Sequence, residues 1–333
     1  MVHRRRAAAG ATRDTVLRLL FFGTPAFAVP TLERLLAGPH PVVAAITQPD
    51  RPRGRGQRQS PSPVAAAAEH AGIPALRTER VGVPAFVEQL RGFAADLGVV
   101  VAFGQFLPRP VRELPRAGFL INAHASLLPR HRGAAPIAWA ILAGDAETGI
   151  SVMRVDREMD AGPVAGVRRT AIGSDETTGA LEHRLAQLAA DAIEEAVARA
   201  AAEQLHWTEQ DPTRVTFAPK ITMEDARLDW REPATALARR VRAMAPRPGA
   251  WTTWDGERLR ILQCRALPAA AAPDLGAAPG TVRVGSGAAP LRIATGDGWL
   301  EPLVLQRAGG KPLDRADFQR GRGLPDGARL GAT

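Results

Sequence analysis

The sequence predicts an α/β protein in two parts: a Rossmann-like unit whose mainly parallel sheet is covered by helices on both faces, and a small antiparallel β-barrel. Apolar strand-like runs alternate with helix-like segments from residue 16 to about 205, a pattern typical of parallel sheets. After residue 206 the runs become short and are separated by Gly, Pro and Asp-Gly turns, which favours an antiparallel barrel. A length of 333 residues accommodates two domains.

The first elements follow one another in a regular order. A strand and turn at 16–25 precede a helix at 25–38, whose final Gly38 is a common residue after a helix. A second strand at 41–49 is followed by a polar loop at 50–63 that is rich in Gly and Pro. The other elements of this part follow in chain order: helices at 64–72 and 83–93, strands at 96–104 and 119–125, a helix at 136–144, strands at 149–155 and 162–172, and a long helical region at 178–205.

The C-terminal part begins with an irregular linker and one amphipathic helix at 234–244. Short strands are expected within 250–267, 280–287 and 290–306. The predicted organisation is a disordered basic arm at 1–15, an α/β domain at 16–205, a linker at 206–222, a barrel domain at 223–325 and a tail at 326–333.

The net charge of +9 is unevenly distributed. Four arginines lie in residues 1–15, and four more lie in "DRPRGRGQR" at 50–58. Such clusters favour a polyanion as a partner, and a solvated surface is the alternative.

No apolar run reaches the roughly 18 residues of a membrane span, and the basic N-terminus lacks the apolar stretch of a secretory signal. We therefore expect a cytoplasmic protein.

Cys264 is the only cysteine. It cannot form an intramolecular disulfide, which fits a reducing compartment. The segment "RILQCRAL" is typical of a strand and holds neither His nor an acid beside the thiol, so a packing role is favoured over a nucleophile. No Cys/His cluster has the spacing of a zinc site, and no metal is expected.

The segment "INAHASLLPRHRGAAPI" at 121–137 holds the main candidate residues. Asn122 and His124 are two apart at a strand end, so their side chains point to the same face. An amide donates to an oxyanion and an imidazole carries a proton near neutral pH. The pair suits acyl transfer to an amine, at the strand ends where such sheets bind ligands. A capping Asn and a structural His are the alternative, and for an isolated Asn-x-His that alternative is the commoner one.

Asp160 in "REMDAGPV" is the candidate partner of His124. A carboxylate beside an imidazole fixes the orientation of the ring. Asp156 and Glu158 compete for this place, and Asp-Ala-Gly alone is an ordinary turn.

Other motifs carry weaker signals. "GRGQR" does not match a phosphate-binding loop, and "FFGTPAFA" has a single glycine, so nucleotide binding is rejected as the primary function. The arginine loop is either a solvated loop or a clamp on a nucleic acid backbone. Five of the six tryptophans follow residue 205. Core packing explains most of them, and one or two are candidates for base stacking.

From about residue 16 to 325 the chain resembles the methionyl-tRNA formyltransferase family. The segments that carry the resemblance are "FFGTPAFAVPTLERLL", "TQPDRPRGRGQRQSPSPV", "INAHASLLPRHRGAAPI", "GISVMRVDREMDAGPV", "FAPKITMEDARLDW" and "LQRAGGKPLDRADFQRGRGL". The resemblance implies formyl transfer from 10-formyltetrahydrofolate to the α-amino group of methionyl initiator tRNA, with tetrahydrofolate as the other product. N-formylmethionyl-tRNA made in this way serves translation initiation.

The resemblance also implies roles for individual residues. Asn122, His124 and Asp160 would form the catalytic trio, and the OB-like C-terminal barrel would hold the tRNA. The implied contacts with the two substrates are Ser126, Leu127, Leu128 and Pro129 for 10-formyltetrahydrofolate, and Arg51, Arg53, Arg55 and Arg58 for the tRNA. A monomer without a metal is expected.

The chain departs from the family pattern at three positions. Ala123 and Ala125 stand where Val and then Gly or Pro are expected, and Phe103 replaces Tyr in a chain without any tyrosine.

Two other functions stay open. A formyltransferase acting on a small amine, such as a nucleotide sugar or glycinamide ribonucleotide, would not need the arginine loop. A tRNA-binding protein without catalysis would not need the intact trio.

Overall fold

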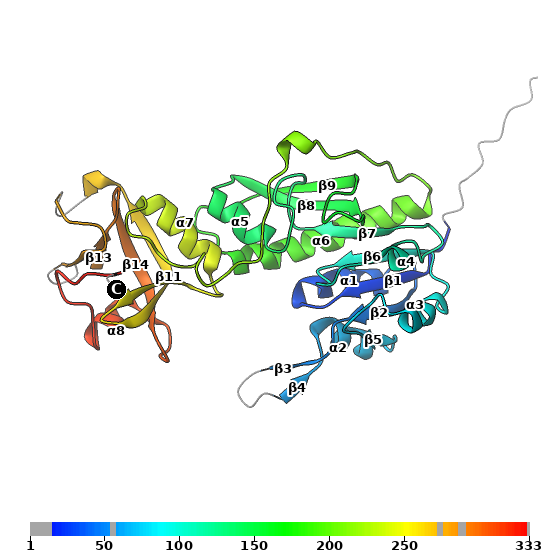
Figure 1. Ribbon diagram of the computed structural model, residues 1–333, viewed down its shortest axis with the longest axis horizontal. Coiled ribbons are helices and arrows are strands. Elements are labelled where there is room, and N and C mark those ends of the chain that lie inside the picture. The colour runs from blue at the N-terminus through cyan, green and yellow to red at the C-terminus, as the bar shows by residue number, and fades with distance from the viewer. Residues whose placement is uncertain (1–14, 54–57, 272–275, 286–290, 332–333) are drawn as a thin grey trace, which may run out of the picture. The chain divides into compact units, whose positions relative to one another are not determined.

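The computed structural model describes residues 15–53, 58–271, 276–285 and 291–331 (Figure 1). The chain divides into two compact units, each of which combines segments that are far apart in the sequence. Unit 1 comprises Met1–Pro129, Gly149–Arg168 and Leu185–Arg214, and unit 2 comprises Arg130–Thr148, Arg169–Arg184 and Val215–Thr333. The basic arm predicted at 1–15 lies outside the described residues, apart from its last residue.

The main sheet has seven strands in the order β5-β2-β1-β6-β7-β8-β9. The pairs from β5 through β7 are parallel and β8 runs antiparallel to β7, which confirms the prediction of a mainly parallel sheet. The strands are β1 (Leu19–Gly23), β2 (Val42–Thr47), β5 (Ala75–Arg77), β6 (Leu97–Val101), β7 (Leu120–His124), β8 (Glu147–Arg154) and β9 (Val164–Ala171).

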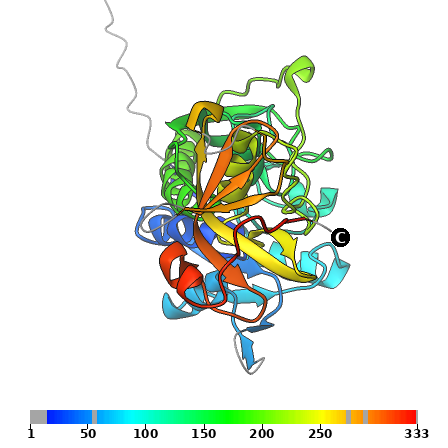
Figure 2. The same ribbon diagram turned by 90° about the vertical axis from the view of Figure 1, so that its left-hand side faces the viewer.

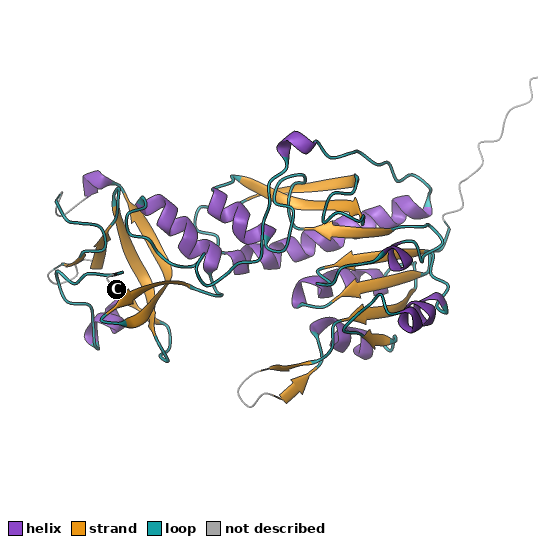
Figure 3. Ribbon diagram, viewed as in Figure 1, coloured by secondary structure: helices purple, strands orange, loops and turns teal. Residues whose placement is uncertain are grey.

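The central strands are buried along their whole length. Every residue of β1 and β6 is buried, because helices cover both faces of the sheet (Figure 3). Leu20, Phe22, Ile46, Val100 and Leu120 belong to one apolar cluster. Burial on both faces explains why these strands read as continuous apolar runs without alternation.

The helices of this part begin with local signals that the sequence displays. Ser62 precedes α2, its hydroxyl accepts from the Ala65 amide at 3.0 Å, and Pro63 takes the first helical position. The short α4 and β5 were not predicted. The helices are α1 (Val29–Leu36) after the 3-10 turn η1 (Ala26–Ala28), α2 (Pro63–His70), α3 (Pro84–Arg91), α4 (Arg109–Arg112) and α6 (Thr178–Ala201).

Unit 2 contains an antiparallel sheet of six strands in the order β10-β11-β14-β13-β12, with β15 paired to β14. Its yellow and orange strands curve in Figure 2, and the predicted antiparallel β-domain is confirmed. The strands are β10 (Ala250–Trp254), β11 (Glu257–Leu267), β12 (Val282–Val284), β13 (Leu291–Ala294), β14 (Trp299–Arg307) and β15 (Leu313–Asp314). The unit also holds the helices α5 (Pro136–Ala143), α7 (Ala234–Met244) and α8 (Arg315–Arg320) and the 3-10 turn η3 (Ala269–Ala271).

The polar loop at 50–63 is more regular than predicted. It contains an antiparallel ribbon of β3 (Arg51–Arg53) and β4 (Arg58–Ser60), in which Arg51 lies opposite Ser60. Gly and Pro content indicates a turn but not the pairing of its flanks, so the sequence alone missed this ribbon. Arg55 lies outside the described residues, and only the backbone of Arg53 and Arg58 is described.

Two tryptophans of unit 2 serve packing, as the sequence suggested. Trp230 and Trp299 are buried, and the Trp230 indole donates to the Thr252 hydroxyl at 3.0 Å. Among the residues that the structure describes, no helix combines the length and the apolar character needed to cross a lipid bilayer.

Cys264 lies half-buried on β11. Desolvation raises the pKa of its thiol to about 12, with a further contribution from Asp175 and opposition from Arg242. A raised pKa leaves little thiolate at neutral pH, and the thiolate is the reactive form. We expect iodoacetamide at pH 8 to alkylate Cys264 about 10²-fold more slowly in the native protein than in urea. Equal rates in the two states would contradict the burial.

Candidate active site

Strand β7 brings Asn122 and His124 to the carboxyl edge of the sheet. Asn122 lies between Val100 of β6 and Met153 of β8, and His124 lies opposite Ser151. Both residues belong to one regular strand, so their side chains share a face. The imidazole is buried and the asparagine is half-buried.

Asp160 is the carboxylate that reaches the imidazole. Its Oδ2 lies 3.6 Å from His124 Nδ1, and both side chains are largely buried, at 17% and 7% exposure. Asp156, one of the two competing acids, accepts a hydrogen bond from the amide of Arg157 at 2.6 Å. A separation of 3.6 Å lies within the range of an ion pair but exceeds a hydrogen bond.

The turn that carries Asp160 has an unusual backbone. Asp160 adopts a positive φ of 53°, a left-handed conformation that Asp tolerates better than most residues. At Gly162 a Cβ atom would lie 2.0 Å from the Arg154 carbonyl oxygen, so only glycine fits. The Gln210 side chain donates to the carbonyls of Asp160 at 2.8 Å and of Gly162 at 2.7 Å.

The turn at 126–129 is held against β8 by a serine that the sequence did not single out. The Ser151 hydroxyl donates to the Ser126 carbonyl at 2.8 Å and accepts from the Leu128 amide at 3.1 Å. Ser126 and Pro129 are buried, whereas Leu127 and Leu128 are half-buried. The backbone that follows β7 is therefore fixed by hydrogen bonds.

The three departures from the family pattern lie in the apolar interior. Phe103, Ala123 and Ala125 are all buried. The Phe103 ring packs edge-to-face on Phe22, with ring centroids 5.6 Å apart. Phenylalanine at this place brings no hydroxyl that would need a partner, so its packing explains how the chain accommodates it.

The basic ribbon is tied to the same edge of the sheet. The side chains of Thr24 and Gln48 both donate to the Phe103 carbonyl at 3.0 Å. Gln48 also accepts from the Arg51 guanidinium at 2.9 Å. The ends of β1, β2 and β6 are thus linked to the first arginine of the ribbon.

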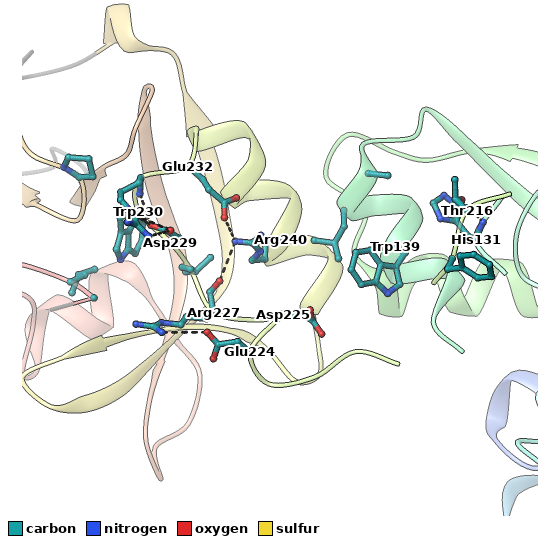
Figure 4. Close-up of a pocket in the computed structure, with 18 of the residues that line it drawn as sticks. His131, Trp139, Thr216, Glu224, Asp225, Arg227, Asp229, Trp230, Glu232 and Arg240 are labelled. Carbon is teal, nitrogen blue, oxygen red and sulfur yellow. Dashed lines mark hydrogen bonds and ion pairs between the residues drawn. The ribbon is translucent and has the colours of Figure 1, made fainter. Parts of the chain in front are cut away.

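Unit 2 contains an open cavity of about 1010 Å³ that none of the predicted catalytic residues lines (Figure 4). Its charges are paired: Arg240 with Glu232 at 2.6 Å and Arg227 with Glu224 at 3.4 Å. Hydrogen bonds from Arg231 lower the pKa of Asp229 to about 2. Because these charges compensate one another, we do not place the chemistry here.

His131, one of the residues that line this cavity, belongs to a second His–Asp pair. His131 Nε2 lies 2.7 Å from Asp145 Oδ2, and Arg130 donates to the other oxygen of Asp145 at 2.6 Å. The His131 amide donates to the Thr216 hydroxyl at 2.8 Å, so the backbone at His131 is also bonded to the segment at 216. Within the described ranges, no group of three or more His, Cys, Asp or Glu residues is arranged to hold a metal ion.

Two family models match the chain. The formyl transferase model matches residues 17–197, and the model of the formyl transferase C-terminal domain matches 220–323. The methionyl-tRNA formyltransferase of Methylococcus capsulatus is 46% identical over 315 residues, covering 95% of this chain and 100% of that protein. The protein of the same name from Solibacter usitatus is 44% identical over 315 residues, covering 95% and 99%.

Solved structures share the fold at low sequence identity. HypX from Aquifex aeolicus in complex with tetrahydrofolic acid has a TM-score of 0.60 at 18% identity, covering 94% of this chain and 49% of that one. An N-formyltransferase from Helicobacter canadensis has a TM-score of 0.62 at 14% identity, covering 88% and 100%.

Proposed function

The chain belongs to the formyl transferase family, and we propose that it formylates methionyl initiator tRNA with 10-formyltetrahydrofolate as the donor. The product, N-formylmethionyl-tRNA, serves translation initiation. The observation that carries the assignment of the site is the approach of Asp160 to His124 at 3.6 Å, with Asn122 on the same strand face.

The three residues divide the chemistry among them. The α-amine of the methionyl ester attacks the formyl carbon, and the Asn122 amide donates to the oxygen, which becomes an oxyanion. His124 accepts the proton of the attacking nitrogen, while Asp160 holds the imidazole in position. The bond from carbon to N10 then breaks, N10 takes up a proton, and tetrahydrofolate leaves. Ser126, Leu127, Leu128 and Pro129 form the contact with the donor in this proposal.

The direct experiment is a formylation assay with 10-formyltetrahydrofolate on charged initiator and elongator methionyl-tRNA. We expect rapid formylation of the initiator tRNA and a lower rate for the elongator. Turnover of a free small amine, indifferent to salt and to tRNA, would contradict the proposal. Tight binding of tRNA without any formyl transfer would indicate a protein that has lost catalysis.

Arginines in both units support a nucleic acid substrate. In unit 1 the ribbon presents the exposed Arg51, and we propose that Arg53, Arg55 and Arg58 join it on the tRNA backbone. In unit 2 two arginines lie over tryptophan rings: the Arg258 guanidinium is 4.6 Å from the Trp251 ring, and that of Arg307 is 4.4 Å from the Trp254 ring.

The ribbon leads to a prediction about salt. Replacing Arg51, Arg53, Arg55 and Arg58 together by Gln should lower kcat/KM for the tRNA about 10-fold near 100 mM salt, because the variant loses contacts with phosphates. Each lost contact should also flatten the dependence of log kcat/KM on log salt concentration by roughly one unit of slope. Kinetics at several salt concentrations would measure this. The control is Arg91→Gln on the exposed face of α3, which should leave the slope unchanged. An unaltered slope in the fourfold variant would exclude the ribbon as the tRNA contact.

We also propose that the enzyme acts as a monomer in the cytoplasm. A single cysteine, which cannot form an intramolecular disulfide, fits a reducing compartment. Light scattering at micromolar concentration should give the mass of one 35.4 kDa chain.

A further inference from the structure

The segment after α6 runs beside the turn that carries Asp160. Val164 and Thr208 form an antiparallel bridge, with N–H···O distances of 2.8 Å and 2.9 Å in the two directions. In an antiparallel pair, two residues back on one chain lie opposite two residues forward on the other. Gln210 therefore lies opposite Gly162, where its side chain meets the turn.

We propose that Gln210 is a positioning residue for the formyl transfer: its carboxamide holds the turn so that the Asp160 carboxylate faces His124. The inference rests on the proposed function, because it gives Gln210 a role through Asp160. The two hydrogen bonds, at 2.8 Å to the Asp160 carbonyl and 2.7 Å to the Gly162 carbonyl, are its basis.

The Gln210 side-chain amide has the hydrogen-bond donors that the two carbonyl groups of the turn require. A primary amide has two N–H donors on one nitrogen, and the turn offers it two carbonyl oxygens from residues that are two apart. Glutamate has nearly the same shape but no donor when ionised, and it would bring a negative charge to both carbonyls. Methionine keeps the length of the side chain without any strong hydrogen bond. Both substitutions remove the clamp and leave the packing volume nearly intact.

The backbone of Asp160 explains why a clamp is needed. Its φ of 53° is a conformation that L-residues rarely adopt, and relaxing it would turn the carboxylate away from Nδ1 of His124. On its other side the turn rests on β8, where Pro163 accepts from the Arg154 amide at 2.9 Å. The turn is thus bonded to β8 through Pro163 and to the segment after α6 through the Gln210 side chain.

The test compares Gln210→Met and Gln210→Glu with Gln204→Met. Gln204 is an exposed residue of the same segment, so its variant controls for a glutamine lost from this stretch. We expect both Gln210 variants to lower kcat about 10-fold with little change in either KM, since misplacing a catalytic group costs rate rather than binding. Hydrogen exchange of the 156–164 backbone should become at least several-fold faster in the Gln210 variants and stay unchanged in the control.

A double-mutant cycle separates positioning from general stability. In an Asp160→Asn background, Gln210→Met should slow kcat by less than about twofold, because a residue acting only through Asp160 has nothing left to position. An equal loss in both backgrounds, or unchanged exchange at 156–164, would overturn the inference. Failure of the wild-type protein to formylate any methionyl-tRNA would refute the proposed function instead, and the exchange measurement would still decide whether Gln210 holds the turn.

Discussion

Replacing Asn122 by alanine should lower kcat for formyl transfer by about 10²–10³-fold, the usual cost of removing one oxyanion donor. The amide acts when the carbonyl oxygen gains charge, so KM for the tRNA and for the folate should change little. Steady-state kinetics on charged initiator tRNA would measure both quantities. Asn122 is the only asparagine among the 333 residues, so a general preference of this chain for asparagine does not explain its presence.

A second variant shows whether the donor or the shape of the side chain matters. Asn122→Asp keeps the size but replaces the donor by a carboxylate oxygen, which would repel the oxyanion. We expect it to be at least as slow as the alanine variant, with an unchanged thermal unfolding midpoint. Full activity in either variant would remove Asn122 from the mechanism.

Replacing His124 by alanine should lower kcat by about 10²–10⁴-fold, the range for loss of a general acid–base group. Asp160→Asn should be slow as well, because the neutral amide neither orients the imidazole in the same way nor stabilises its charge. If the two residues act as a unit, the double variant should be about as slow as the slower single variant. Rates from single-turnover experiments would avoid masking by product release.

The matched control for this prediction is Asp156→Asn. Asp156 lies four residues before Asp160 and accepts a hydrogen bond from the amide next to it, so its loss should change kcat by no more than about threefold, as expected of an acid outside the reaction. Independent, multiplying losses in His124→Ala and Asp160→Asn would show that the two residues do not function as a pair. A strong loss in Asp156→Asn would transfer the role to that residue.

Much of the fold was predictable because its causes are local. Strands buried on both faces read as unbroken apolar runs, which is why β1, β2, β6 and β7 were recognised together with their order of alternation with helices. The ribbon of β3 and β4 was missed, since its three-residue strands hold polar and basic residues and one proline, which carry no pattern of burial. Short elements such as α4 and β5 lack enough residues for a periodic signal.

Only part of the candidate site could be predicted from the sequence. Asn122 and His124 were placed together because a strand puts residues two apart on one face. Three acids competed for the place beside His124, and their spacing in the sequence did not rank them. The path of the turn after β8 decided the matter: it brings Asp160 to 3.6 Å from the imidazole.

By itself, then, the sequence determined the alternating α/β unit, the antiparallel β-domain and the pair on β7, since all of these depend on the order of neighbouring residues. Only the tertiary structure decided which acid faces the imidazole and which side chains hold the surrounding turns. Gln210 is 50 residues from Asp160 and Ser151 is 25 from Ser126. Contacts over such separations depend on strand register and chain crossings, which long-range packing sets and no local pattern encodes.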